Sequence, residues 1–115
     1  MDGLILYQKL SDLSQWLFPA VDNFPRREKF ALCTQIKNSV YTLVRQTIRA
    51  QKSRDKLRHL FELDLELEML RFLVRSAHHQ RYLSTRRYEI VARMLSEIGK
   101  IVGGLFKTFG KGGRP

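Results

Sequence analysis

This 115-residue sequence predicts an all-α fold, an up-down-up-down antiparallel four-helix bundle. Helix breakers are rare: there are three prolines and seven glycines, and five of the glycines lie close to the C-terminus. Apolar residues recur at spacings of three and four instead of alternating, and the one hairpin-type dipeptide, Asp2-Gly3, is at the N-terminus. The connections between the predicted helices are short, which favours antiparallel neighbours.

The first helix is predicted from Leu4 to Asp22, with a core stripe of Leu6, Leu10, Leu13, Leu17 and Val21. Pro19 is expected to kink its last turn. Pro25 disfavours helix at the preceding residue and suits the first turn of a new helix, so the second helix is predicted from Arg26 to Gln51. Its buried face would consist of Phe30, Cys33, Ile36, Val40, Leu43, Val44 and Thr47.

The third and fourth helices begin with candidate capping residues. Ser53 is expected to cap a helix from Arg54 to Arg81. Ser84 or Thr85 is expected to cap a fourth helix that ends near Phe109.

One domain accounts for nearly the whole chain. Residues 1–109 are predicted to form the four-helix bundle, and residues 110–115 a flexible, basic, glycine-rich tail. Gly99 and Gly103 lie one turn apart in the fourth helix and lower its intrinsic stability. This cost is explained if a neighbouring backbone packs closely against them. For Gly103 and Gly104 the alternative is a frayed C-terminal turn.

The third helix has two apolar stripes. Leu60, Leu63, Leu67, Leu70, Val74 and Ala77 follow a heptad spacing and form the predicted core side. The opposite side, which a single bundle would expose, consists of Phe61, Leu65, Met69 and Phe72. This second stripe is interpreted as an interface for self-association or a protein partner. The alternative is that neighbouring helices wrap around it.

The charge is strongly positive and unevenly distributed. There are 21 Lys and Arg residues against 11 Asp and Glu, for a net charge of +10. Residues 45–58 contain six basic residues and one acid, and residues 71–93 contain the same numbers. These two segments account for the whole imbalance, so we expect a polyanionic partner. The alternative is a basic surface that only confers solubility.

Basic residues also form rows at helical spacing. Arg86, Arg93 and Lys100 recur every seven residues of the fourth helix, so their Cα atoms lie about 10.5 Å apart along one line. Such rows can meet successive phosphates, although Glu89 and Glu97 are placed to pair with them. The predicted nucleic-acid contacts are Arg45, Arg49, Lys52, Arg54, Arg58, Arg86, Arg87, Arg93 and Lys100.

Several kinds of chemistry are excluded by residue type. Cys33 is the sole cysteine, which rules out an internal disulfide and the cysteine-rich zinc sites. No histidine follows an acid by three residues, as a ferritin-like metal site requires, so no metal or cofactor is expected. The adjacent His78 and His79 are interpreted as a solvated helix end. With no secretory signal and no long apolar run, the protein is expected to be cytoplasmic, without a membrane contact.

One catalytic pattern remains. Arg54, Asp55 and His59 match the Arg, polar residue, three residues, His motif of the helical ribonuclease bundles called HEPN domains. In such a site His acts as a general base on a ribose hydroxyl and Arg stabilises phosphate charge. A capped, exposed, basic helix start explains the same residues, and the favoured prediction is a nonenzymatic protein.

Five short motifs run along the chain. They are Trp-Leu-Phe-Pro at 16–19, Asn-Phe-Pro-Arg-Arg-Glu-Lys-Phe-Ala-Leu at 23–32, Met-Leu-Arg-Phe-Leu-Val-Arg at 69–75, Tyr-Leu-Ser at 82–84 and Met-Leu-Ser-Glu-Ile-Gly-Lys-Ile-Val-Gly-Gly at 94–104. In this order and spacing the sequence resembles the accessory variability determinant (Avd) proteins of diversity-generating retroelements. It is similar, more loosely, to the four-helix proteins encoded in intervening sequences of large ribosomal RNA.

The resemblance implies a homopentameric ring that binds the retroelement's reverse transcriptase and template RNA, and with them the cDNA. It implies an accessory role in mutagenic cDNA synthesis, with the polymerase chemistry in the partner. Arg71 and Arg75 match the family's Leu-Arg-Phe-x-x-Arg motif, so the resemblance places the reverse-transcriptase contact there. The ribosomal relatives, which would make this a generic RNA-binding bundle, are not expected to have so large a basic excess.

Overall fold

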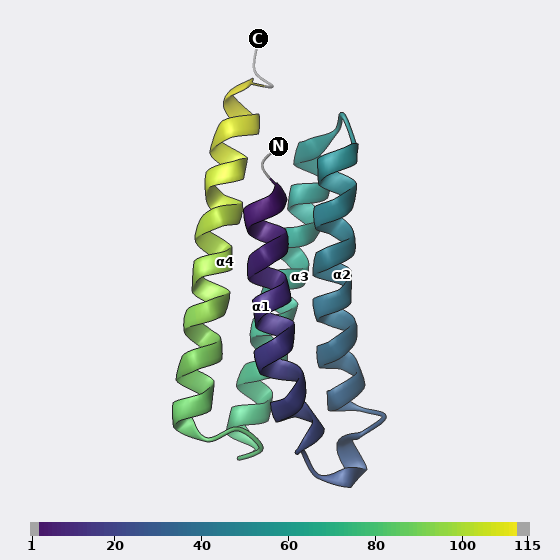
Figure 1. The fold of residues 1–115 in the computed structure, drawn as a ribbon, viewed down its shortest axis with the longest axis vertical. Helices are drawn as coiled ribbons and strands as arrows, with labels where there is room; N and C mark the ends of the chain where they lie inside the picture. The colour runs from purple at the N-terminus through teal and green to yellow at the C-terminus, as the bar shows by residue number, and fades with distance from the viewer. Residues whose placement is uncertain (1–2, 113–115) are drawn as a thin grey trace.

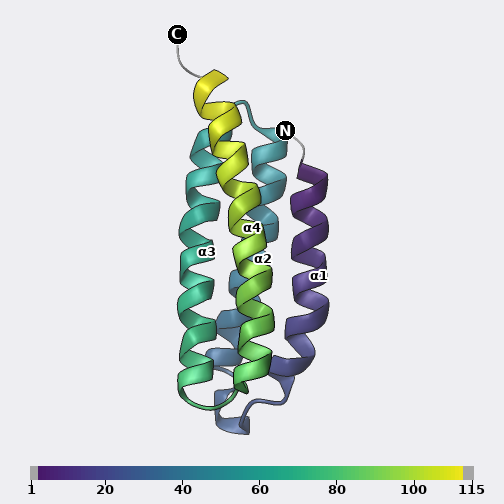
Figure 2. The same ribbon diagram turned by 90° about the vertical axis from the view of Figure 1, so that its left-hand side faces the viewer.

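The computed structural model describes residues 3–112, and the regular elements within them are all helices. The order is α1 (Gly3–Asp22), the 3-10 helix η1 (Arg26–Glu28), α2 (Leu32–Lys52), α3 (Lys56–His79) and α4 (Thr85–Gly112). Figures 1 and 2 show the four long helices running alternately up and down, side by side. Neighbours in the bundle are α1 with α2, α2 with α3, α3 with α4, and α4 with α1. The predicted all-α four-helix bundle is confirmed.

The core consists of the apolar stripes that the sequence predicts. All five stripe residues of α1 are buried, as are Ile36, Val40 and Leu43 of α2 and the heptad positions of α3. Cys33 and Thr47 are buried as predicted, while Val44 is half-buried against the core. Pro19 lies inside α1, which continues past it to Asp22. The stripes therefore meet along the long axis of a body that measures 52 × 24 × 20 Å.

The start of α2 differs from the prediction. This helix begins at Leu32 instead of Arg26, and Ala31 before it has non-helical dihedral angles (φ −117°, ψ −103°). The Glu28 carboxylate accepts a hydrogen bond from the hydroxyl of Tyr82 at 2.8 Å, which ties this segment to the distant connection between α3 and α4. Phe30 was predicted to be buried, and that prediction is wrong: it precedes the helix and is 86% exposed.

The ends of α3 also shift. The helix begins at Lys56, after the predicted Arg54, and ends at His79 instead of Arg81. Asp55, not Ser53, is its N-cap, because the Asp55 carboxylate accepts a hydrogen bond from the backbone N–H of Arg58 at 3.4 Å. The Ser53 hydroxyl instead accepts from the N–H of Asp55 at 3.0 Å and shapes the connection.

Ser84 caps α4 as predicted, since its hydroxyl accepts a hydrogen bond from the N–H of Arg87 at 3.2 Å. The helix continues to Gly112, past the predicted end at Phe109. Of the predicted tail, residues 113–115 lie outside the described residues.

The prediction of close backbone packing at the α4 glycines is wrong within the described chain. A Cβ at Gly99 would lie 2.5 Å from Nη2 of Arg71, which is a side-chain atom. A Cβ at Gly103 would have nothing within 4 Å. At Gly99, therefore, the close neighbour of α4 is the long Arg71 side chain of α3. At Gly103 the surface of α4 is open.

Candidate nucleic-acid and partner surfaces

The outer face of α3, defined as Phe61, Leu65, Met69 and Phe72, is exposed in the single chain. The exposed fractions are 67%, 67%, 45% and 59% in that order, whereas the core leucines of the same helix are buried. Phe61 also meets Phe106 of α4 edge to face, with ring centroids 5.2 Å apart. Neighbouring helices therefore leave this face uncovered, which excludes the alternative that they wrap around it.

Further exposed apolar side chains were not singled out from the sequence. Leu4, Ile5 and Tyr7 are exposed near the start of α1, and Tyr41 and Ile48 are exposed on α2. Their exposure could have been predicted from the sequence, because these residues lie away from the core stripes of their helices. These residues add apolar area to the surfaces that a partner or a second copy can cover.

A basic α2–α3 end forms where these two helices connect. Its members, all exposed, are Arg45, Arg49, Lys52, Arg54 and Arg58. The first three lie on the last turns of α2, Arg54 lies in the connection and Arg58 on the first turn of α3. The structure thus brings five of the predicted nucleic-acid contacts to one end of the bundle, at the upper right of Figure 1.

The basic α4 row consists of Arg86, Arg93 and Lys100, together with Arg87 beside Arg86 on the first turn, and all four side chains are exposed. Glu97 pairs with the ammonium of Lys9 on α1 at 2.7 Å, and this hydrogen bond raises the pKa of Lys9. Within residues 3–112, none of the four cations of the row is in an ion pair. The acidic neighbours therefore leave the row open to an external anion.

Arg71 and Arg75 differ in their surroundings. The Arg71 guanidinium pairs with Glu68 and donates from Nη2 to the carbonyl oxygen of Leu95 on α4 at 3.4 Å. It occupies the space that a side chain at Gly99 would need. Arg75 is exposed. Arg71 is thus held between α3 and α4, whereas Arg75 is available to a partner.

Arg54 and His59 are separated by the start of α3. Arg54 is exposed in the connection, and His59 is half-buried with its Nδ1 atom 3.3 Å from Oε1 of Gln46 on α2. Gln46 thus engages one of the two ring nitrogens and holds the imidazole against the neighbouring helix. A contact between helices accounts for His59 without a catalytic role.

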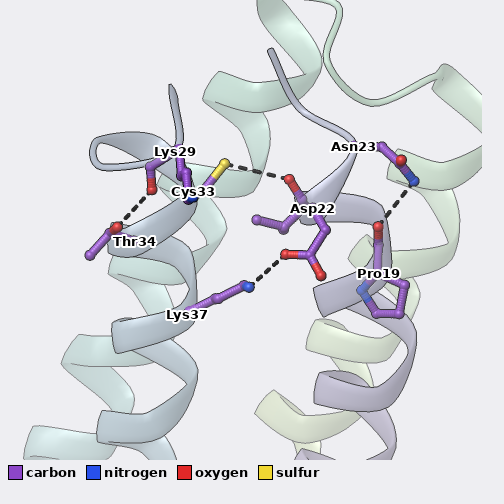
Figure 3. Close-up of polar contacts among 8 residues, drawn as sticks. Pro19, Asp22, Asn23, Lys29, Cys33, Thr34 and Lys37 are labelled. Carbon is purple, nitrogen blue, oxygen red and sulfur yellow. Dashed lines mark hydrogen bonds and ion pairs between the residues drawn. The ribbon is translucent and has the colours of Figure 1, made fainter. Parts of the chain in front are cut away.

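At the α1–α2 end lies a cavity of about 510 Å³ lined by cationic and apolar side chains. Figure 3 shows the Lys37 ammonium, which is 2.6 Å from the Asp22 carboxylate, and this bond raises the pKa of Lys37. The Cys33 thiol donates to the carbonyl of Val21 at 3.4 Å, and burial raises its pKa. The carboxylate here is already paired, and the thiol is held in its unreactive protonated form.

A second, open cavity lies at the α3–α4 turn, where His79 is exposed at the end of α3, as the interpretation of a solvated helix end predicts, while His78 is half-buried. It has a volume of about 510 Å³, and its lining includes both histidines together with Arg75 and Arg81. The feature of the sequence that indicates this cavity is the cluster of Arg75, His78, His79 and Arg81 shortly before the capping Ser84.

Among residues 3–112, no group of three or more His, Cys, Asp or Glu residues is placed to hold a metal ion. None of the described helices is both long and apolar enough to cross a membrane.

A comparison with curated proteins finds no match. A model of bAvd-like proteins matches residues 4–109, which include most of each of the four helices. The chain therefore belongs to the bAvd-like family, in agreement with its resemblance to the accessory variability determinant proteins.

Proposed function

We propose that this chain is a nonenzymatic accessory protein of a diversity-generating retroelement. It binds the reverse transcriptase and the template RNA and supports mutagenic cDNA synthesis. The observation that carries this proposal is membership of the bAvd-like family over residues 4–109. The net charge of +10 supports a polyanionic partner.

Two surfaces are proposed to contact nucleic acid: the basic α2–α3 end and the basic α4 row. Both consist of exposed cations, and those of the α4 row have no ion-pair partner within the described chain. RNA and its cDNA copy present the same regularly spaced phosphates, so both are ligands for these surfaces. Contacts of this kind position a nucleic acid without reading its bases.

The reverse transcriptase is proposed to contact α3 through Arg75, with Arg71 as a positioning residue. This division is supported by the exposure of Arg75 and by the contacts of Arg71 with Glu68 and Leu95. Removal of Arg75 deletes a contact to the partner, whereas removal of Arg71 loosens the α3–α4 packing behind it.

Co-purification with the reverse transcriptase of the retroelement to which this chain is proposed to belong tests the proposal. The wild-type chain is expected to retain the tagged enzyme, and Arg71→Ala combined with Arg75→Ala to lose it. His59→Ala is the matched control, because His59 lies near the opposite end of α3 and is expected to leave association intact. Equal retention by the double variant and the wild type would refute the assigned contact.

The outer face of α3 is proposed to form the interface of a homo-oligomer, with a pentameric ring preferred from the family resemblance. The support is an exposed row of four large apolar side chains that the chain's own helices leave uncovered.

The nonenzymatic part of the proposal has its own test. Highly purified protein is incubated with labelled RNA and compared with His59→Ala. No cleavage above background is expected from either protein. Turnover by the wild type that disappears in the variant would overturn the assignment in favour of a HEPN-like ribonuclease.

A further inference from the structure

At the α3–α4 turn lies an open cavity that borders the first residues of the α4 row and shares Arg75 with the surface proposed for the reverse transcriptase. Its volume is about 510 Å³, and its lining residues are Arg75, His78, His79, Arg81, Leu83, Ser84 and Thr85. Two guanidinium groups, two imidazoles and two hydroxyls therefore surround one space, and no carboxylate lines it. In the cavity at the α1–α2 end, by contrast, Asp22 is among the lining residues and pairs with Lys37.

Arg81 occupies a backbone position that favours glycine. Its φ of 67° makes it the one non-glycine residue with positive φ in the described chain. The N–H of Tyr82 donates to the carbonyl of Ala77, and the N–H of Arg81 to that of His78, each at 2.9 Å. This is the Schellman pattern, in which glycine usually occupies the position of Arg81. The turn thus contains an arginine where glycine would be less strained.

The His78 ring and the Thr85 hydroxyl are held in place at the rim of this cavity. The His78 ring stacks on the Tyr88 ring with centroids 4.4 Å apart and planes inclined by 8°. Its Nε2 atom lies 3.3 Å from the hydroxyl of Thr85, the first residue of α4. Ser84 caps this 28-residue helix and Thr85 begins it, and both line the cavity, so the positive end of the helix dipole lies beside the same space.

We propose that this cavity is a phosphate-binding pocket. Guanidinium groups offer paired donors that match phosphate oxygens, and imidazole and hydroxyl donors complete a shell for a tetrahedral dianion. A carboxylate ligand would use fewer of these donors. The bound phosphate group comes from a nucleic-acid backbone, a terminal phosphate or free phosphate, and all three share this chemistry.

Arg81→Gly is the decisive variant, because it removes the guanidinium and relieves the strained backbone at the same time. Inorganic phosphate is titrated calorimetrically into the full chain at constant ionic strength, with acetate as the comparison anion. Phosphate is expected to bind saturably and more tightly than acetate. Arg81→Gly is expected to weaken this binding by at least about tenfold, the loss of one charge-assisted contact, while the melting temperature stays equal or rises.

Two further variants complete the design. Arg81→Asn also suits positive φ but keeps a side chain, so it is expected to lose binding like Arg81→Gly. Lys107→Gln removes the same charge from an exposed position near the end of α4 that is far from this turn, and it is expected to bind phosphate as the wild type does. Phosphate binding that is no stronger than acetate binding, or that is unchanged in Arg81→Gly, would overturn the proposal.

The source of the phosphate is resolved with short oligoribonucleotides that differ only at the 5′ end. Stronger binding of the 5′-phosphorylated form, abolished in Arg81→Gly, assigns the pocket to a terminal phosphate. Equal binding of both forms, weakened in Arg81→Gly, assigns it to the backbone. The phosphate titration uses neither RNA nor reverse transcriptase, so its failure is distinguishable from failure of the proposed accessory function.

Discussion

Lys56 connects the end of α2 to the start of α3. Its ammonium donates to the carbonyl oxygens of Ala50, Gln51 and Ser53 at 3.0, 3.2 and 2.9 Å. Carbonyls in the last turn of a helix lack intrahelical partners, and a cation there is also favoured by the helix dipole. One side chain therefore terminates α2 and keeps the connection from continuing as helix, which explains why α3 begins later than predicted.

Lys56→Met is expected to lower the free energy of unfolding by about 1–2 kcal/mol, because three carbonyls, two of them in partly buried contacts, lose a charged donor. Urea denaturation followed by circular dichroism measures this change. Lys107→Met, an exposed lysine of α4, serves as the control and is expected to stay within about 0.5 kcal/mol of the wild type. Equal stability of the two variants would show that water replaces the Lys56 contacts without loss.

Among the helices, α4 contains the clearest opportunity for stabilisation. Gly103 is exposed, and a Cβ there meets nothing within 4 Å. Gly103→Ala is expected to raise the free energy of unfolding by about 0.5–1 kcal/mol, because alanine loses less backbone entropy in a helix. Gly99→Ala is expected to gain less, since its methyl group would displace Arg71 from Leu95. Thermal denaturation of both variants measures the difference.

The result at Gly103 also bears on assembly. A Gly103→Ala variant that is less stable, or that dissociates an oligomer, would contradict an open surface there. It would mean that a second copy packs its backbone against α4.

At the scale of the whole molecule, the bundle separates the two basic segments that lie close in sequence. The connection between α2 and α3 and the connection between α3 and α4 lie at opposite ends of a body 52 Å long (Figure 1). The outer face of α3 runs between these ends. An assembly built through this face would therefore repeat both basic ends around its axis.

Light scattering on the wild-type chain is expected to give the mass of several protomers, with five preferred. Phe61→Glu combined with Phe72→Glu is expected to reduce this mass, because two buried charges would be required at the interface. The helical circular dichroism should be unchanged, since both side chains are exposed in the single chain. A wild-type chain that is monomeric at micromolar concentration would contradict the proposed interface.

RNA affinity is expected to fall steeply with salt. An assembly that makes six to ten phosphate contacts would lose roughly 10³ to 10⁵ in affinity between 50 and 200 mM salt. Replacement of Arg86, Arg93 and Lys100 by Gln should flatten the slope of affinity against salt, and filter binding at several salt concentrations measures it. An unchanged slope would identify the α4 row as a solvated face.

The fold class, the core and the exposed stripe could be predicted because they depend on periodicity. Leu6, Leu10 and Leu13 share one face of a helix whatever that helix packs against, and they are buried. Phe61 and Phe72 lie on the side opposite the core, and they are exposed. For the same reason Arg86, Arg93 and Lys100 of α4 could be placed in one row before their neighbours were known.

The sequence by itself determined four helices, their buried faces and a basic surface, because each follows from residue spacing and charge along the chain. Only the tertiary structure decided where the helices begin, since Glu28 is held by Tyr82 and Lys56 by the end of α2. It also decided that Glu97 pairs with Lys9, away from the α4 row. The Glu28–Tyr82 and Lys9–Glu97 contacts join residues far apart in the chain. The Lys56 contacts depend on how the connection folds back on the end of α2, and the positive φ of Arg81 arises in a turn between packed helices, so helical periodicity does not encode them.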